Sequence, residues 1–328
     1  MDTRPLGALG PVSVLTLGGG GLGQIWGETS RKEAVATARA AVDAGITLLD
    51  VAPGYGRGEA ERVIGEAFAG RLPEGVRIGT KVMVGDPGPG AVADRIEHSL
   101  SRSLEALRLD RVDCCFLHSN LVPDGYVLAR HPEVQHRLAT PWTRYVDEVR
   151  PAFERLVAEG RIGAWGITGV ALPRTVLDAL ADAPAPAAVQ CIANLLDSAG
   201  SIYVHDEPPR HREVIAAAAG RGIGVLGIRA VQAGALTDSV DRQLADDEPE
   251  MADYRRAAAF RTLATEVGDS PAALAHRYAL AMDSVDTVVL GVKNRVELAE
   301  CVAAAARGPL DAALVARIDE AVGRKGSA

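Results

Sequence analysis

The chain has 328 residues, of which 48% are hydrophobic and 24% charged, and its formal net charge is −8 at pH 7. This composition is ordinary for a globular protein, and a single α/β domain can reach this length, so we predict one domain over residues 1–328. The acidic balance makes nucleic acid and anionic membrane surfaces poor partners, because no basic cluster opposes it.

Short apolar runs alternate with amphipathic stretches along the whole chain, a pattern typical of a parallel sheet with helical crossovers. Eight runs have the length of a strand, and eight strands can close a barrel. The predicted strands are Val12–Gly18, Thr47–Ala52, Val76–Met83, Val112–His118, Gly163–Thr168, Ala188–Ala193, Gly224–Arg229 and Thr287–Gly291. Helical spacing of apolar residues predicts helices at Arg31–Ala44, Glu59–Ala69, Ala91–Leu107, Thr143–Glu159, Pro173–Ala181, Arg210–Arg221 and Pro271–Met282. We therefore predict an α/β fold of the (β/α)8 TIM-barrel type.

Two connections are longer than a simple crossover needs. They are Asn120–Trp142, after the fourth predicted strand, and Ala230–Tyr254, after the seventh. Both follow the carboxyl ends of strands, where a barrel places its active-site loops, so we predict that they wall the site. The first connection contains Tyr126, His131, His136 and Trp142, of which Tyr126 and Trp142 are candidate substrate contacts. Scattered loop residues without a role are the alternative.

Ionisable residues stand at the ends of three consecutive predicted strands. Asp50, Lys81 and His118 end the second, third and fourth strands, and Tyr55 lies in the loop after the second. Core packing favours apolar side chains, so a purely structural role explains these positions poorly. We expect all four side chains to meet at one rim of the barrel.

These four residue types suit the reduction of a carbonyl group. The reaction needs a proton donor near the oxygen that becomes an alkoxide, and a free tyrosine, with a pKa of about 10, is a weak acid. Lys81 would lower the pKa of Tyr55, and Asp50 would keep Lys81 charged and oriented. His118 would donate a hydrogen bond to the carbonyl oxygen of the substrate.

The motifs around these residues resemble those of the aldo-keto reductase superfamily, whose members carry an Asp, Tyr, Lys, His tetrad. The resemblance rests on GITLLDVAPGYGRGEAERVIGEAF, the GTK of residues 79–81 and DRVDCCFLHS, and it extends from LGALGPVSVLTLGGG to LGVKNRVELAEC. It implies an N-terminal β-hairpin that plugs the bottom of the barrel. It also implies hydride transfer between a nicotinamide cofactor and an aldehyde, ketone or sugar carbonyl, with Tyr55 as the general acid or base.

The resemblance further implies contacts to the cofactor. Gln190 matches a residue that binds the nicotinamide carboxamide. Thr168 and Gly169 replace a Ser-Asn pair, and the Thr168 hydroxyl could still donate to the carboxamide. The stretch GVLGIRAVQAGALT resembles the loop over the pyrophosphate, which implies contacts from Ile228, Arg229, Gly234 and Leu236. Many relatives stack an aromatic ring on the nicotinamide where this chain has Ile228 or Arg229.

The stretch LGVKNRVELAEC lies where relatives hold adenine and the adenosine 2′-phosphate. The implied contacts are Gly291, Lys293, Asn294, Glu297 and Glu300. Glu297 would repel a 2′-phosphate, and Cys301 replaces a usual Asn, but Lys293 and Arg295 would supply positive charge. NADP(H) is therefore the favoured cofactor, and NAD(H) is possible.

Three glycines, Gly18, Gly20 and Gly23, match a dinucleotide-binding G-x-G-x-x-G pattern, but the context of this motif is missing. No helix opens directly after them, and no acidic residue follows about 20 positions later. In the barrel, Gly20 and Gly21 would let the cofactor approach the backbone or would simply form a turn. Trp26 is then a candidate wall of the substrate pocket, together with Tyr55 and His118.

Two other functions stay open. One is a cofactor-sensing regulatory or accessory subunit, resembling the potassium-channel β subunits that share this fold. The other is a barrel isomerase or lyase that uses Lys81 as a Schiff-base amine. We predict no metal site, because His205 and His211 have the setting of loop residues. Aromatic residues make up only 4% of the chain, which favours a polar substrate such as a sugar over a large steroid-like one.

The segments that direct proteins to membranes or out of the cell have no counterpart in the sequence. The N-terminus lacks a secretory apolar stretch, and no run of about 18 uncharged apolar residues occurs. The four cysteines, Cys114, Cys115, Cys191 and Cys301, lack metal-ligand spacing and are predicted to be buried thiols. We predict a soluble, cytoplasmic protein. The sequence leaves its oligomeric state open.

Overall fold

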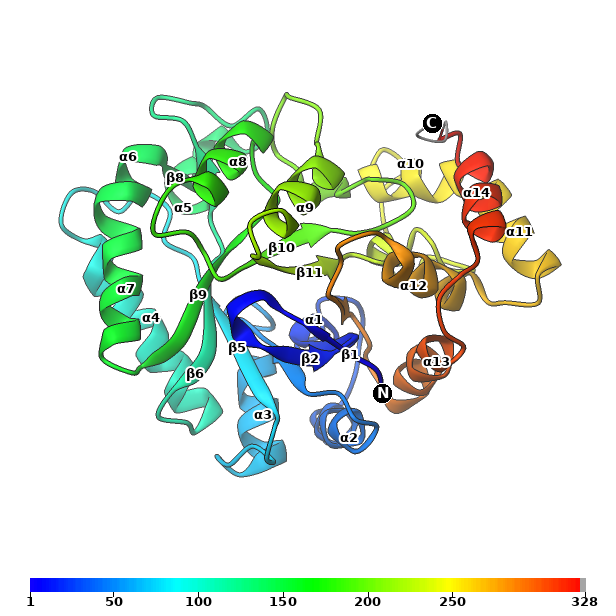
Figure 1. Ribbon diagram of the computed structural model, residues 1–328, viewed down its shortest axis with the longest axis horizontal. Coiled ribbons are helices and arrows are strands. Elements are labelled where there is room, and N and C mark those ends of the chain that lie inside the picture. Colours follow the sequence, from blue (N-terminus) through cyan, green and yellow to red (C-terminus); the bar gives the residue numbers. More distant parts are fainter. Residues whose placement is uncertain (325–328) are drawn as a thin grey trace.

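Eight parallel strands close into a barrel in the computed structural model, which describes residues 1–324 (Figure 1). Around the barrel the strands follow chain order, and the last pairs with the first. The strands are β3 (Leu15–Gly18), β4 (Leu48–Asp50), β5 (Arg77–Val82), β6 (Val112–Leu117), β9 (Ile162–Thr168), β10 (Ala188–Ile192), β11 (Gly224–Ile228) and β12 (Thr287–Leu290). The predicted (β/α)8 barrel is confirmed. The prediction of one domain stays a prediction, and its last four residues lie outside the described part.

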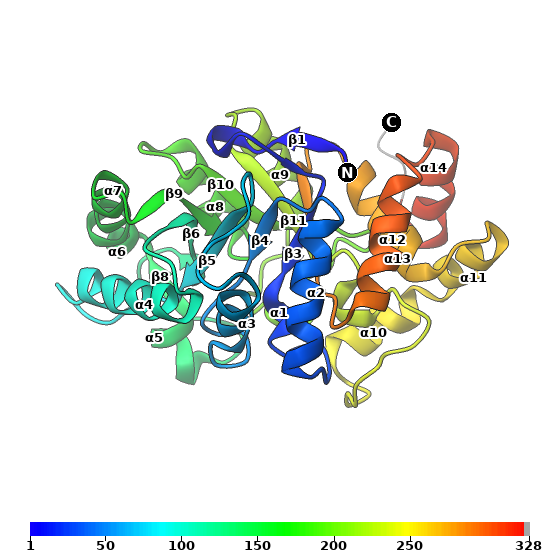
Figure 2. The same ribbon diagram turned by 90° about the horizontal axis from the view of Figure 1, so that it is seen from below.

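Helices cover the outside of the barrel, because each has an apolar face that packs on the strands. Six predicted helices are present: α2 (Arg31–Asp43), α3 (Glu59–Phe68), α4 (Val92–Leu107), α8 (Pro173–Ala181), α9 (His211–Ala219) and α12 (Pro271–Ala281). The seventh, at Thr143–Glu159, consists of α6 (Trp142–Arg144), a π-helical turn (Tyr145–Val149) and α7 (Arg150–Ala158). Six helices were not predicted: the short α1 (Gly19–Leu22) and α5 (Gln135–Leu138), and α10 (Pro249–Arg256), α11 (Ala258–Glu266), α13 (Arg295–Ala306) and α14 (Ala312–Ala321). Among them, α13 lies beside α2, where the barrel closes (Figure 2).

The N-terminal hairpin covers the end of the barrel where the strands begin. Strands β1 (Thr3–Pro5) and β2 (Pro11–Ser13) pair antiparallel around a single turn of 3-10 helix, Gly7–Leu9. Leu6 is fully buried and packs among strand residues that include Phe116 and Leu226. The predicted plug is therefore confirmed. Because Pro11–Ser13 belongs to this hairpin, the first barrel strand begins at Leu15 and not at Val12.

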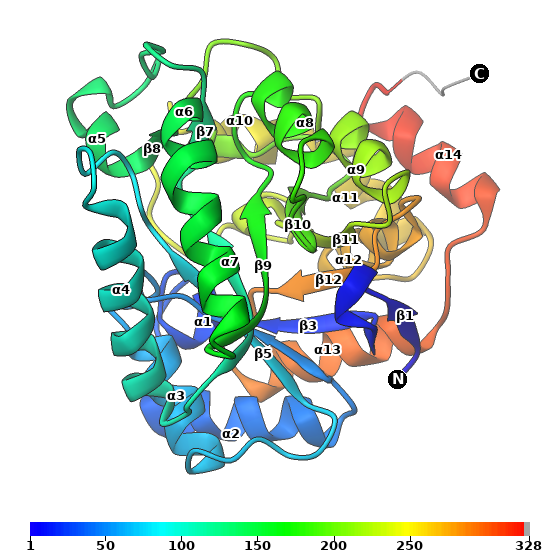
Figure 3. The same cartoon turned by 60° about the vertical axis from the view of Figure 1, so that its left-hand side comes forward.

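Both long connections have structure of their own. In Asn120–Trp142, strands β7 (Asn120–Val122) and β8 (Ala139–Pro141) form a two-stranded parallel ribbon, and α5 (Gln135–Leu138) precedes β8 in the chain (Figure 3). The connection after β11 runs through a 3-10 turn at Gln232–Gly234 and then into α10. In residues 1–324, no helix has both the length and the apolar character that a membrane span requires.

Candidate active site

A buried ion pair lies at the carboxyl ends of β4 and β5. Lys81 Nζ is 2.7 Å from both carboxylate oxygens of Asp50 and 3.1 Å from the carbonyl oxygen of Val51. The two charged side chains are 1% and 3% exposed. Gln190, on β10, donates a further hydrogen bond of 2.8 Å from Nε2 to Asp50 Oδ1. Hydrogen bonding therefore compensates for the loss of water around both charges.

Tyr55 and His118 complete the predicted group of four. Lys81 Nζ lies 4.9 Å from the centroid of the Tyr55 ring. The His118 ring meets the Tyr55 ring edge to face, with 6.0 Å between centroids. Strand ends β4, β5 and β6 thus bring together side chains that are up to 68 positions apart in sequence, counted from residue 50 to residue 118.

Burial and the nearby charges shift the pKa of three of these groups. Burial raises the pKa of Tyr55 above its ordinary value, and the Lys81 ammonium opposes this rise. Burial is the largest influence on Lys81 and disfavours its charge, but Asp50 and Tyr55 together outweigh burial, so the pKa of Lys81 is raised. Burial, and then Lys81, lower the pKa of His118 to about 3. At neutral pH, Tyr55 is protonated, Lys81 is charged and His118 is neutral. The expected effect of Lys81 on Tyr55 is present, but desolvation is larger.

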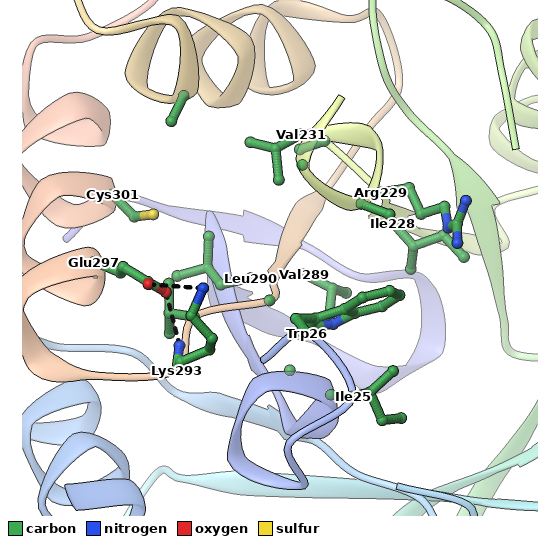
Figure 4. A pocket seen from close by; sticks show the side chains of 18 of the residues that line it. Ile25, Trp26, Ile228, Arg229, Val231, Val289, Leu290, Lys293, Glu297 and Cys301 are labelled. Atoms are coloured by element: carbon green, nitrogen blue, oxygen red, sulfur yellow. Dashed lines mark hydrogen bonds and ion pairs between the residues drawn. The ribbon is translucent and has the colours of Figure 1, made fainter. Parts of the chain in front are cut away.

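A cavity of about 560 Å³ opens at this end of the barrel and contains most of the predicted site. Figure 4 shows its side chains, with Trp26 and Ile25 on one side and Lys293 and Glu297 on another. Predicted residues that line it are Gly20, Trp26, Asp50, Tyr55, His118, Thr168, Gln190, Ile228, Arg229, Gly234, Gly291, Lys293, Glu297 and Glu300.

The cavity wall has a polar group without a partner at the position predicted for the nicotinamide carboxamide. The buried hydroxyl of Thr168 has no hydrogen-bond partner among the described residues. It lies on β9, next to Gln190 in the strand register. An unpaired buried hydroxyl is costly unless a ligand satisfies it, so the wall fits a ligand with hydrogen-bonding groups, such as a carboxamide.

Carboxylates dominate the far end of the cavity, at the start of α13. Glu297 accepts hydrogen bonds from the Lys293 backbone N–H at 2.8 Å and from Asn294 Nδ2 at 3.2 Å. Lys293 Nζ lies 3.1 Å from the same carboxylate and also pairs with Asp241. Arg295 is turned away and forms an exposed ion pair with Glu33, on α2. Each predicted cation therefore already has a carboxylate partner.

Two predicted cofactor contacts, Leu236 and Asn294, do not line the cavity. Leu236 is fully buried in the main core. Asn294 does not line the cavity, and its side chain caps α13 by accepting the Glu297 N–H at 2.9 Å. Asn294 therefore acts on the cavity only through Glu297.

The glycines near the first strand make room for the protein itself. A Cβ atom on Gly20 would lie 2.4 Å from Trp26 Nε1, and one on Gly21 would lie 2.0 Å from the carbonyl oxygen of Val292. Gly20 lines the cavity but Gly21 does not. The close neighbours of these two glycines are Trp26 and the segment after β12, and the predicted approach of the cofactor to their backbone stays a prediction.

The two aromatic residues predicted in the first long connection stay outside the cavity. Tyr126 donates a 2.7 Å hydrogen bond to Asp206 Oδ1, and its ring packs against His205. Trp142 packs against Tyr145, in the π-helical turn. Neither ring lines the cavity, so Tyr126 and Trp142 do not form part of its wall.

Other lining residues were not predicted. The guanidinium of Arg242 lies 5.7 Å from the Trp26 ring centroid and has no carboxylate within ion-pair distance in residues 1–324. Ile25, Ile202 and His276 also line the cavity. No sequence signal marks an arginine within a long loop or an isoleucine at a rim, because the backbone path decides where such side chains point.

Most of the chain is similar to a known enzyme family. The family model described as "Aldo/keto reductase family" matches residues 14–322. The chain belongs to the aldo/keto reductase family. This aldo/keto reductase is therefore an oxidoreductase, in agreement with the prediction from its motifs.

Curated relatives agree with this assignment, and a solved structure shares the fold. L-galactose dehydrogenase of Arabidopsis thaliana is 28% identical over 309 residues, which cover 93% of this chain and 88% of that protein. D-threo-aldose 1-dehydrogenase of a Pseudomonas species is 29% identical over 264 residues, 73% of this reductase and 72% of that protein. The fold matches the glycerol dehydrogenase of Gluconobacter oxydans, with a TM-score of 0.72 at 22% identity over 98% of this chain and 95% of the other.

Proposed function

We propose that the protein interconverts a carbonyl compound and its alcohol with a nicotinamide dinucleotide, and that Tyr55 is the general acid and base. The observation that supports this is the buried Asp50–Lys81 pair beside Tyr55, at the wall of a cavity. When bound, the nicotinamide would supply the hydride that adds to the carbonyl carbon, or accept it from the alcohol. Thr168, Gln190, Gly234 and Arg229 would hold the dinucleotide.

Each of the four side chains would have its own role in the proton transfer. Tyr55, protonated at neutral pH, would give its proton to the carbonyl oxygen while the carbon gains the hydride, so that the alcohol forms. Lys81 would stabilise the phenolate left behind, and Asp50 would fix the position of Lys81. His118, which is neutral, would donate a hydrogen bond to the same oxygen. In oxidation the proton returns to Tyr55.

Removal of the Tyr55 hydroxyl tests this assignment. We expect Tyr55→Phe to lower turnover of a reactive aldehyde by at least about 100-fold, with cofactor binding retained, because a positioned acid contributes about that much. Tyr126→Phe is the matched control, since Tyr126 lies outside the cavity. Normal turnover by Tyr55→Phe would remove Tyr55 from the mechanism. A wild-type protein that binds cofactor but reduces no aldehyde would be a sensing subunit instead.

The arrangement around Glu297 favours NAD(H) over the NADP(H) that the sequence favoured. Lys293 and Arg295, the cations expected to hold a 2′-phosphate, are paired with Asp241, Glu297 and Glu33. The Glu297 carboxylate already occupies the position beside the N-terminus of α13, where a helix attracts an anion. A 2′-phosphate there would meet like charge, whereas the ribose hydroxyls of NAD(H) could donate hydrogen bonds to Glu297.

Binding titrations can test the cofactor preference without a substrate. We expect NADH to bind at least about tenfold more tightly than NADPH, which corresponds to about 1.4 kcal/mol. Glu297→Gln, which removes the charge and keeps the shape, should narrow this ratio by improving the affinity for NADPH. Tighter NADPH binding by the wild type would restore the original prediction. If neither dinucleotide bound, the proposed function would fail.

The names of these relatives indicate sugars or polyols as their substrates, so a sugar carbonyl is a candidate substrate of this protein. We also propose a cytoplasmic location. Its support is that all four cysteines are buried and free, as expected in a reducing compartment.

A further inference from the structure

Helix α3 carries a buried carboxylate to which the proton transfer assigns no role. Glu61 is 2% exposed, and its Oε1 accepts a 2.7 Å hydrogen bond from the hydroxyl of Thr80, which is fully buried. In residues 1–324 no basic side chain lies within ion-pair distance of Glu61, and the adjacent Arg62 pairs with Glu59 instead. Burial of a carboxylate without a cation is costly, so packing alone does not explain an acid at this position.

The hydrogen bond joins the two elements that carry Tyr55 and Lys81. Thr80 directly precedes Lys81 on β5, and neighbouring residues of a strand point to opposite faces, so Thr80 faces α3 while Lys81 faces the inside of the barrel. Tyr55 is held from the other side, because its carbonyl oxygen accepts a 3.2 Å hydrogen bond from the N–H of Ala60, the residue before Glu61. The Glu61–Thr80 hydrogen bond therefore completes a short chain of contacts from Tyr55 through α3 to Lys81.

The loop between Tyr55 and α3 makes the position of this helix important. Its three residues, Gly56, Arg57 and Gly58, all have a positive φ, of 64°, 55° and 83°. This region is unfavourable for a residue with a side chain, such as Arg57, so contacts on either side of the loop must hold its backbone. Since only three residues separate Tyr55 from α3, a shift of the helix would move Tyr55.

Glu61 and Thr80 lie behind the active site and not in it. Neither residue lines the cavity, so neither contacts a cofactor or substrate there. Burial raises the pKa of Glu61, and hydrogen bonding to hydroxyl groups and, after that, the charge of Lys81 oppose this rise. Any effect of the two residues on turnover would therefore pass through the side chains that their elements carry.

We propose that Glu61 and Thr80 are positioning residues, whose hydrogen bond holds Tyr55 and Lys81 in the geometry that the proton transfer needs. This inference rests on the proposed function, because the bond acts through Tyr55. A displacement of about 1 Å at a reacting group can lower a rate about 100-fold. Loss of the bond should therefore lower turnover although the cavity wall is unchanged.

Thr80→Val tests the bond, because valine keeps the shape of threonine and removes the hydroxyl. With nitrobenzaldehyde and the tighter-binding nicotinamide dinucleotide, we expect kcat to fall at least about tenfold and the dissociation constant of the dinucleotide to stay within about twofold. Thr80→Ser keeps the donor, so its kcat should stay within about threefold of the wild-type value. All assays are made well below the melting temperature of each variant.

Thr37→Val is the matched control for a merely structural effect. Thr37 is also fully buried, its hydroxyl donates a 2.8 Å hydrogen bond to the Glu33 carbonyl within α2, and it lies outside the cavity. We expect Thr37→Val to lower the melting temperature and to leave kcat unchanged. Equal kcat values in Thr80→Val and Thr37→Val would overturn the inference.

Glu61 provides a second pair of variants. Glu61→Gln keeps an oxygen that accepts the Thr80 hydroxyl and should retain kcat within about threefold, whereas Glu61→Leu should lower kcat as much as Thr80→Val does. Equal losses in Glu61→Gln and Glu61→Leu would contradict a role of the hydrogen bond. If Glu61→Leu does not fold, the comparison of Thr80→Val with Thr80→Ser decides.

A combined variant separates the inference from the proposed function. If the bond acts only through the Tyr55 hydroxyl, Thr80→Val should lower the residual kcat of Tyr55→Phe by less than about twofold. A loss in that background as large as in the wild-type background would overturn the inference and leave the role of Tyr55 intact. Normal turnover by Tyr55→Phe would instead contradict the proposed function.

Discussion

The charges of Lys81 and Asp50 are almost completely excluded from water, yet every hydrogen-bonding direction of the ammonium is used. Lys81 Nζ contacts both carboxylate oxygens and the Val51 carbonyl, and Gln190 adds a donor to Asp50. Removal of one partner would leave a buried, unpaired charge, which costs about 3–5 kcal/mol. Variants of Asp50 or Lys81 would therefore lose stability together with activity. Tyr55→Phe is the better test of the reaction, because it removes only the hydroxyl and keeps the uncharged ring.

The pH dependence of catalysis should reflect Tyr55 alone. Reduction needs the protonated phenol, which persists below its pKa, and burial raises that pKa above the ordinary value. His118, with a pKa of about 3, stays neutral from weakly acid to alkaline pH. We expect kcat/KM for aldehyde reduction to be level from about pH 5 to pH 9 and to fall only above the ordinary pKa of a tyrosine, about 10. A change in rate centred near the ordinary histidine pKa, about 6.5, would show that His118 titrates and contradict this prediction.

Residues at strand ends were predictable from the sequence, whereas residues in the long connections were not. Asp50, Lys81 and His118 meet because parallel strands in a barrel end at the same rim, a geometry that the strand pattern already fixes. Tyr126 lies in the loop between β7 and β8, and its direction depends on a partner far along the chain, Asp206. Trp142 begins α6 directly after β8, and its direction depends on packing against Tyr145. Polarity and spacing do not encode those partners.

The same contrast holds for the elements. In the sequence, strands stand out as short apolar runs, and helices with one apolar face stand out by the regular spacing of their apolar residues. All eight barrel strands were predicted from such runs. Helix α13 has alanine and other small residues on most sides, so no apolar stripe marks it, and its sequence was treated as a cofactor segment. Half of the residues of helix α10 are charged, and the helix begins inside a predicted connection. Its position depends on the buried Arg229–Glu250 pair, which only the folded chain reveals.

The capping residues of α13 and α14 allow a matched test at the scale of one helix. Asn294 and Asp311 each accept a backbone N–H, at 2.9 and 2.7 Å, and only Asn294 also contacts Glu297 through its side chain. We expect Asn294→Ala and Asp311→Ala to lower the free energy of unfolding by about 1 kcal/mol each, measured by denaturant titration. Only Asn294→Ala should change the NADH-to-NADPH affinity ratio, because the Glu297 carboxylate loses one of its donors. Equal ratios in both variants would show that Asn294 does not position Glu297.

At the scale of the whole molecule, the residues that pack the closed end of the barrel lie apart from the residues of the candidate active site. The hairpin and its buried Leu6 cover the amino ends of the strands, while the cavity with Tyr55 and Glu297 opens at the carboxyl ends. Barrels generally carry their active sites at the carboxyl end, so residues at the other end can change packing without a change in reacting groups. Closure of the barrel depends on contacts between the two ends of the chain, where β12 pairs with β3 and Arg295 pairs with Glu33.

Truncation of Leu6 should therefore lower stability and spare activity. Leu6 is fully buried against residues of β4, β6, β10 and β11, so Leu6→Ala would leave a cavity and cost about 2–5 kcal/mol of unfolding free energy. Leu9, only partly buried beside the same cluster, is the matched control, and Leu9→Ala should cost clearly less. Well below the melting temperature, kcat/KM of Leu6→Ala should stay within about twofold of the wild-type value, because no atom at the carboxyl end is changed. A large loss of kcat/KM in folded Leu6→Ala would mean that packing at the closed end is transmitted along the strands to Tyr55, and the two ends would then have to be treated as one coupled unit.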